Sequence, residues 1–208
     1  MASLTADGVG HRYGSLLLFR RLSFEVGGGD SLAVTGANGA GKSTLLRILA
    51  GVLAPKAGRV RLTVDGEAVA PEVHPRRAGL VAPALGLYDP LSARENLAFL
   101  ARARRLADAD DRIDATLTRV GLAGRADDPV STFSSGMRQR VKYAAALLAD
   151  PPLLLLDEPA ANLDAAGREM VETVVAAQRE GGGIVVVATN RADEAARHDR
   201  MLRIEDHR

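Results

Sequence analysis

Hydrophobic and polar residues alternate along the first third of the chain, and this pattern predicts short β-strands. Apolar side chains occupy every second position over residues 22–26 and over residues 60–64, the latter just before the turn pair Asp65-Gly66. A period of two places these side chains on one face of a sheet. A glycine-rich turn at residues 27–30 precedes a third predicted strand over residues 31–35.

Longer apolar spacing predicts helices, the first beginning near Lys42 and others following from about residue 87. Ser92 and Glu95 have the spacing of a capping box, so a helix is expected to begin there. Further helices are predicted over residues 110–120, over residues 141–150 and from about residue 165.

Two uninterrupted apolar runs, residues 153–156 and 184–188, predict strands that are covered on both faces. Their alternation with helices predicts an α/β fold, in which helices cover a parallel sheet. We expect one domain over residues 1–208, with a catalytic core of about 1–86 and 145–208 and an inserted helical lobe of about 87–144.

Composition removes several function classes. The chain has a formal net charge of +1, which gives no reason to expect a nucleic-acid partner. It has no cysteine, which excludes disulfides, thiolate catalysis and cysteine-ligated metals. No apolar run reaches the ~20 residues that a membrane-spanning helix needs, and the N-terminus has no secretory signal pattern. We therefore expect a soluble protein.

The motif GANGAGKST, residues 36–44, lies between a predicted strand and a predicted helix and fits the Walker A phosphate-binding pattern. Its glycines let backbone N–H groups curve around phosphate oxygens, and the helix N-terminus attracts negative charge. Lys42 is expected to reach the β- and γ-phosphates, and Ser43 to bind Mg²⁺. A glycine-rich turn without a ligand is the alternative. The candidate nucleotide-binding residues are Gly36, Asn38, Gly39, Gly41, Lys42, Ser43 and Thr44.

Two acidic residues, Asp157 and Glu158, end the apolar run LLLL. Parallel strands bind ligands at their carboxyl ends, and the phosphate loop lies at the same edge of the predicted sheet. Asp157 is therefore a candidate Mg²⁺ ligand through water, and Glu158 can orient or deprotonate the attacking water. An acidic helix cap is the alternative interpretation of this pair.

The segment FSSGM, residues 133–137, precedes this acidic pair. The order of the phosphate loop, FSSGMRQR and LLLLDEPAANLD resembles that of the ATP-binding cassette (ABC) ATPases, whose signature is usually LSGGQ. The resemblance covers essentially the whole chain. It implies a P-loop NTPase cassette with a mostly parallel sheet, an N-terminal antiparallel β-subdomain and an inserted helical lobe. Ser135 and Met137 depart from the usual signature, whereas Ser134 and Gly136 are retained.

The resemblance implies that two copies meet head to tail, so that the signature of one closes over the γ-phosphate held by the other. Ser134 and Gly136 would contact this ATP, because a hydroxyl and exposed amides at a helix N-terminus attract an anion. A plain helix cap is the alternative. Asp164, in the segment ANLD, would lie across the dimer contact near the opposite phosphate loop. Tyr13 stands where the family places an aromatic ring against adenine, although a tyrosine on an edge strand would look the same.

Two parts of the family pattern are missing. After the apolar run at residues 184–188, the family has a histidine that contacts the γ-phosphate, whereas this chain has Thr189 and Asn190. Asparagine donates an amide hydrogen bond but carries no charge. His198 is expected to be a surface residue on a helix rather than a substitute. The glutamine that the family places before the helical lobe is also missing, and Pro83 falls near its position.

These losses predict slow hydrolysis by the isolated protein. Catalysis is assigned to Glu158, which carries most of it, together with Lys42 and Asn190. The loop at residues 81–88, where the glutamine would lie, is rich in apolar residues. In the family this region borders the groove that receives a helix of the membrane subunit. The loop is therefore part of that contact, a buried connector between lobes, or both.

The resemblance implies the ATP-hydrolysing subunit of a transporter. Such a subunit binds ATP and Mg²⁺, pairs with a second copy or a related cassette, and drives an integral membrane permease from the cytoplasmic face of the membrane. The short chain favours an exporter-type cassette. The alternatives are a degenerate cassette that binds ATP as a regulator, a soluble ABC ATPase outside transport, and a P-loop kinase or GTPase. No nucleic-acid partner is expected.

Overall fold

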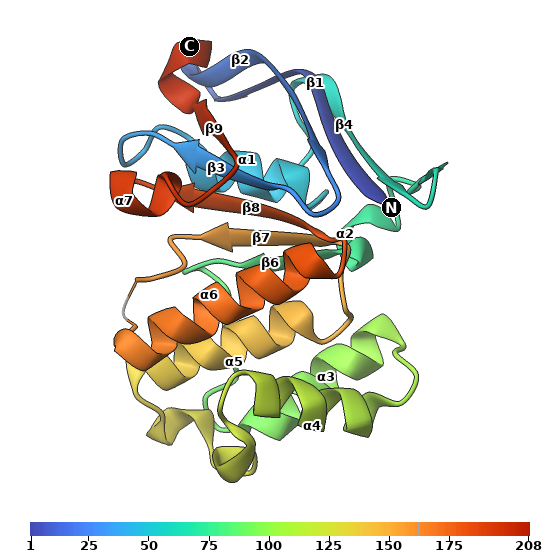
Figure 1. Cartoon of the computed structure of the whole chain (residues 1–208), viewed down its shortest axis with the longest axis vertical. Coiled ribbons are helices and arrows are strands. Elements are labelled where there is room, and N and C mark those ends of the chain that lie inside the picture. Colours follow the sequence, from blue (N-terminus) through green and yellow to red (C-terminus); the bar gives the residue numbers. More distant parts are fainter. Residues whose placement is uncertain (162) are drawn as a thin grey trace.

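The computed structural model of the protein describes residues 1–161 and 163–208. It is layered (Figure 1): an antiparallel sheet lies over helix α1, a parallel sheet follows, and the longer helices cover the far face of that sheet. The antiparallel sheet has the strand order β2-β1-β4-β5. Its strands are β1 (Ala2–Tyr13), β2 (Leu16–Gly27), β4 (Ala57–Val64) and β5 (Glu67–Ala68).

The second sheet is parallel throughout and has the order β6-β7-β8-β3-β9. Three of its strands were predicted from sequence and are confirmed, namely those that follow the glycine turn and the two apolar runs. The outer strands β6 and β9 were not predicted. The five strands are β3 (Ser31–Thr35), β6 (Ala78–Val81), β7 (Leu153–Asp157), β8 (Ile184–Thr189) and β9 (Arg200–Arg203).

Seven α-helices occur in the described part of the chain, and the five long ones correspond to the predicted helices, although the helix predicted over residues 141–150 spans Ser135–Leu147. The predicted capping box is present: the Ser92 hydroxyl accepts from the N–H of Glu95, whose carboxylate accepts from the N–H of Ser92. The helices are α1 (Lys42–Leu49), α2 (His74–Arg77), α3 (Ala93–Arg104), α4 (Ala109–Arg119), α5 (Ser135–Leu147), α6 (Ala165–Glu180) and α7 (Ala192–Ala195).

The parallel sheet separates two hydrophobic cores. Leu153 and Leu155 of β7 face the core that contains α1 and the antiparallel sheet, whereas Leu154 and Leu156 face the core formed with α3 to α6. All four side chains are fully buried, which explains why this strand has no polar alternation. The division into a catalytic core and a helical lobe stays a prediction.

Tyr13 ends strand β1, which lies between β2 and β4 in the sheet order. Strand β1 as a whole is therefore not an edge strand. Its pairing with β4 ends at Gly10, however, so Tyr13 itself is paired only with Leu16 of β2. Within residues 1–161 and 163–208, every helix is too short or too polar to span a lipid bilayer.

Candidate nucleotide site

The phosphate loop joins β3 to α1, as predicted. Gly41 caps α1 with a φ of 109°, in the left-handed region that favours glycine. A Cβ atom at Gly41 would lie 3.2 Å from both the Leu18 Cβ and the Phe19 ring. Strand β2 therefore packs closely against the loop, and this contact together with the positive φ favours glycine at this position.

The loop presents several unused backbone donors. The N–H groups of Gly39, Gly41, Lys42 and Ser43 have no acceptor within the described residues. Because these groups belong to a positive-φ loop and the first turn of a helix, they suit the oxygens of a phosphate group. The loop therefore fits the nucleotide that its sequence predicts.

The Lys42 side chain lies across this loop and is only 6% exposed. Its Nζ donates to the carbonyl oxygen of Gly36 at 2.8 Å and lies 3.7 Å from Oε1 of Glu158. One ammonium group thus connects the phosphate loop to the acidic end of β7. A phosphate anion in the loop would lie within reach of this charge.

A cavity of about 460 Å³ brings together most of the predicted nucleotide-binding residues. Gly36 lies behind the loop instead, against the Glu205 carboxylate. The hydroxyl of Ser43 and the buried carboxylate of Asp157 are oxygen donors of the kind that Mg²⁺ prefers. Mg²⁺ held by these two residues would neutralise negative charge on the phosphates. The lining includes Tyr13, Asn38, Gly39, Gly41, Lys42, Ser43, Thr44, Pro83, Asp157 and Glu158.

No group of three or more histidine, cysteine, aspartate or glutamate side chains in the described chain can hold a metal ion.

Glu158 has a strained backbone and a perturbed carboxyl group. Its φ is 50°, an uncommon value for a residue with a side chain, and its N–H donates to the Ala188 carbonyl at 2.9 Å. Burial raises the pKa of Glu158, the Lys42 charge opposes this shift, and Asp157 and Glu194 reinforce it. A raised pKa makes the carboxylate a better proton acceptor.

Asn190 follows β8 and faces the phosphate loop. Its Nδ2 donates to Oδ1 of Asn38 at 3.2 Å, although Asn190 does not itself line the cavity. The missing histidine is therefore replaced by an amide that contacts the loop. Asn190 keeps its predicted location, and its catalytic role stays a prediction.

The signature residues form a second cavity of about 470 Å³, which shares no lining residue with the first. Ser134 is the N-cap of α5, and its hydroxyl accepts from the N–H of Met137 at 3.2 Å. Gly136 and Asp164 line the same cavity. The helix-cap interpretation of Ser134 is thus correct, and it leaves the N-terminus of α5 facing an open cavity.

Asp164 caps α6 by accepting from the N–H of Gly167 at 2.7 Å, and it lies 3.7 Å from the guanidinium of Arg140. Asn162, in the same ANLD segment, lies outside the described residues. The segment thus places Asp164 beside the signature cavity of its own chain.

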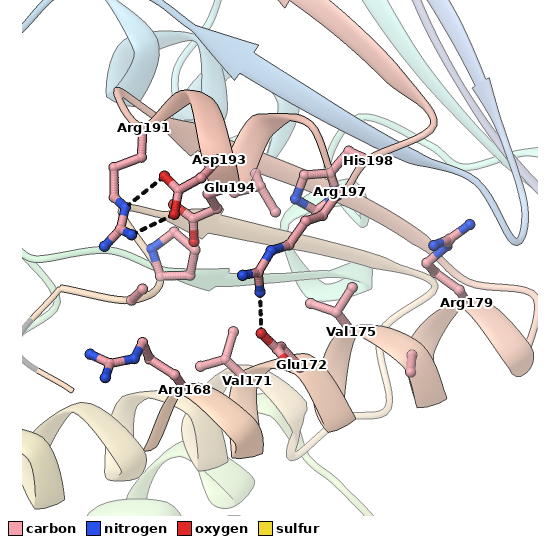
Figure 2. Close-up of a pocket in the computed structure, with 14 residues that line it drawn as sticks. Arg168, Val171, Glu172, Val175, Arg179, Arg191, Asp193, Glu194, Arg197 and His198 are labelled. Carbon is pink, nitrogen blue, oxygen red and sulfur yellow. Dashed lines mark hydrogen bonds and ion pairs between the residues drawn. The ribbon is translucent and has the colours of Figure 1, made fainter. Parts of the chain in front are cut away.

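His198 is a correction to the sequence analysis. It lies in a bend after α7 rather than on a helix, and it is half-buried rather than exposed. Burial lowers the pKa of its ring. It lines a pocket between α6 and the α7 segment, away from the phosphate loop (Figure 2). It therefore does not replace the missing histidine.

Sequence reasoning missed two residues whose side chains bind backbone groups next to the nucleotide cavity. Lys142 of α5 donates from Nζ to the Pro83 carbonyl at 2.8 Å and so ties the signature helix to the loop that lacks the glutamine. Glu205 accepts from the Ala37 N–H at 2.6 Å. No local motif predicts either contact, because each one joins distant parts of the chain.

The loop at residues 81–88 is buried at its start and exposed at its end. Val81 and Ala82 are buried and connect β6 to the helices. Tyr88 is 56% exposed, and its ring packs edge-on against Phe99 of α3, with the centroids 5.4 Å apart. The first part is a buried connector, and the last part presents an aromatic surface.

Comparison with known proteins gives one consistent result. The family model described as "ABC transporter" matches residues 19–161. The chain is 43% identical over 176 residues to the "Cytochrome c biogenesis ATP-binding export protein CcmA" of Pseudomonas putida strain KT2440, covering 84% of this chain and 82% of the relative.

Solved structures agree on the fold. One described as an "ATP binding subunit of ABC transporter" is 28% identical, with a TM-score of 0.81 over 94% of this chain and 82% of the other. A dimeric "bacterial ABC transporter cassette", MJ0796, has a TM-score of 0.82 over 96% of this chain and 93% of the other. At 24% identity it supports the fold alone. The predicted P-loop cassette fold is confirmed.

Proposed function

Starting from the fact that this chain belongs to the ABC transporter family and is an ATP-binding, ATP-hydrolysing transporter subunit, we propose that it drives export through a separate membrane permease by closing as an ATP-bound dimer. The relative from Pseudomonas putida is named an export protein of cytochrome c biogenesis. Export by this chain is inferred from that likeness. The substrate would be selected by the permease.

One observation carries the dimer proposal. The phosphate loop, Asp157 and Glu158 line one cavity, while Ser134 and Gly136 line another with no residue in common. A signature that does not contribute to the cavity of its own phosphate loop suits contact with a second copy. A two-fold arrangement of two such chains would complete two sites at once.

ATP would act as part of the contact in this proposal. A ligand shifts an equilibrium only as far as it binds one state better than the other. ATP held by Lys42 of one copy and by the α5 N-terminus of the other meets that condition, because only the closed dimer supplies both sets of donors. Hydrolysis then weakens the contact and reopens the pair.

Tyr88 and Phe99 provide the surface that we assign to the permease. Both side chains are about half exposed. Tyr88 ends the loop at residues 81–88, and Phe99 belongs to α3. Lys142 ties that loop to the signature helix. A helix of the permease packed on this aromatic pair would therefore lie close to both the nucleotide cavity and α5.

Copurification tests this assignment. The tagged chain, extracted from its own cells in mild detergent, is expected to bring down an integral membrane protein that raises its rate of phosphate release. The double variant Tyr88→Ser, Phe99→Ser is expected to recover at least about tenfold less of it, because two large aromatic contacts are lost. Met201→Ser, an exposed apolar residue on β9, is the matched control.

The outcomes separate the competing functions. No membrane partner, together with full hydrolysis by the chain alone, would favour a soluble ATPase outside transport. Binding of ATP with no phosphate release, alone or with the partner, would favour a regulatory cassette. The missing glutamine and the Asn190 substitution are the reason to keep that second candidate.

A further inference from the structure

One hydrogen bond next to Asn190, between Thr189 and Glu194, has no role in the function described so far. The Thr189 hydroxyl, fully buried at the end of β8, donates to Oε2 of Glu194 at 2.6 Å. The hydroxyl oxygen of Thr189 also accepts from the N–H of Arg191 at 3.1 Å. The Thr189 hydroxyl thus stabilises the turn that carries Asn190. It is itself hydrogen-bonded to Glu194 of α7, which is half-buried.

Glu194 is directed to this hydroxyl because the nearby arginines have other partners. Figure 2 shows Arg191 paired with Asp193, and Arg197 paired with Glu172 across the pocket. A hydrogen bond to an ionised carboxylate is roughly twice as strong as one between neutral groups. The charge on Glu194 therefore strengthens its hold on Thr189.

The other side of the same turn faces the catalytic residues. Asn190 donates from Nδ2 to Oδ1 of Asn38 in the phosphate loop at 3.2 Å. Ala188, two residues before Asn190, accepts from the N–H of Glu158 at 2.9 Å through its carbonyl oxygen. A shift of this turn would change the position of Asn190 relative to both catalytic elements.

Little else holds α7 on the side that faces α6. A pocket of about 220 Å³ separates them, with apolar side chains such as Val171 and Val175 along α6 (Figure 2). The ion pair that crosses it, Arg197–Glu172, joins two side chains that are about 60% exposed. Exposed pairs of this kind contribute little to stability. Two side-chain contacts join the turn to α7: the bond from the buried Thr189 hydroxyl to Glu194, and the exposed Arg191–Asp193 pair.

We propose that Glu194 and Thr189 are positioning residues for hydrolysis, whose hydrogen bond holds the turn at residues 189–191 so that Asn190 faces the phosphate loop and Glu158. This inference rests on the catalytic roles proposed for Asn190 and Glu158. An uncharged asparagine attracts phosphate weakly, so its alignment has to come from the turn that carries it.

Steady-state hydrolysis by the full-length protein tests the pair. Thr189→Val and Glu194→Gln are each expected to lower kcat, by about tenfold and about threefold respectively, because Val removes the bond and Gln leaves a neutral acceptor. The KM for ATP is expected to stay within about twofold, since the phosphate loop is untouched. Thr189→Ser keeps the hydroxyl and should restore kcat. Glu180→Gln, the same change at an exposed position at the end of α6, should leave both constants unchanged.

A double-mutant cycle separates alignment of Asn190 from general stability. In an Asn190→Ala background, Thr189→Val is expected to cause no further loss of kcat, because there is no side chain left to align. A full second loss would overturn the proposal, as would wild-type kcat in Thr189→Val. If Glu158→Gln is inactive while the Thr189 and Glu194 variants resemble the wild type, this inference alone fails. If Glu158→Gln is fully active, the proposed site fails as well.

Discussion

Glu158→Gln is expected to lower phosphate release by at least about 100-fold, because an amide cannot accept the proton of the attacking water. ATP binding should persist, since glutamine keeps the shape of the side chain and Lys42 remains in place. Hydrolysis is the step that reopens the proposed dimer. The variant with Mg·ATP is therefore expected to elute from a sizing column as a dimer, whereas the wild type returns to monomers.

Glu172→Gln is the matched control for this variant, because it makes the same change at an exposed position on α6. It should hydrolyse ATP at the rate of the wild type and should not stay dimeric. We expect that wild-type rate to be slow in the absence of the permease, given the missing histidine and glutamine. Fast turnover that survives Glu158→Gln would contradict the assignment of Glu158.

Lys42→Met is expected to weaken ATP binding by about 10- to 100-fold, measured by titration with a fluorescent ATP analogue. Lys42 is the only basic residue that lines the cavity in the described part of the chain. Methionine keeps much of the length and removes the charge, so the charge-assisted bonds to phosphate, worth about 1.5–3 kcal/mol, are lost.

The same substitution removes the bonds from Nζ to the carbonyls of Gly36 and Ala37, so a small loss of thermal stability is also expected. Lys56→Met, at an exposed position outside the cavity, is the control. Equal ATP affinity in Lys42→Met and the wild type would show that the loop does not hold the phosphates in the predicted way.

Much of the fold could be predicted because local signals were strong. The apolar run that forms β7 has no alternation, which matches its burial between two cores. The capping box at Ser92 located the start of α3 to the residue. By contrast, β6 and β9 are four residues long and have no clear period. They form because β7 and β3 offer free edges, which a local pattern does not reveal.

The candidate site likewise has parts that the sequence predicts and parts that it does not. The phosphate loop and the acidic pair are contiguous motifs, so their chemistry could be predicted from a few neighbouring residues. The contacts of Lys142 with Pro83 and of Glu205 with Ala37 arise only when distant segments meet. The role inferred for Glu194 depends on one hydroxyl–carboxylate distance, and an acidic residue in a helical turn gives no such signal.

Cross-linking between two copies tests the central claim most directly. The chain has no native cysteine, so only the introduced thiols can react. Glu158→Gln protein carrying Ala37→Cys is mixed with Glu158→Gln protein carrying Ser135→Cys, and a short bis-maleimide is added. We predict a covalent pair that forms with Mg·ATP and not without nucleotide, because ATP brings the phosphate loop of one copy against the signature of the other. No covalent pair with Mg·ATP, or as many pairs without nucleotide as with it, would contradict the account.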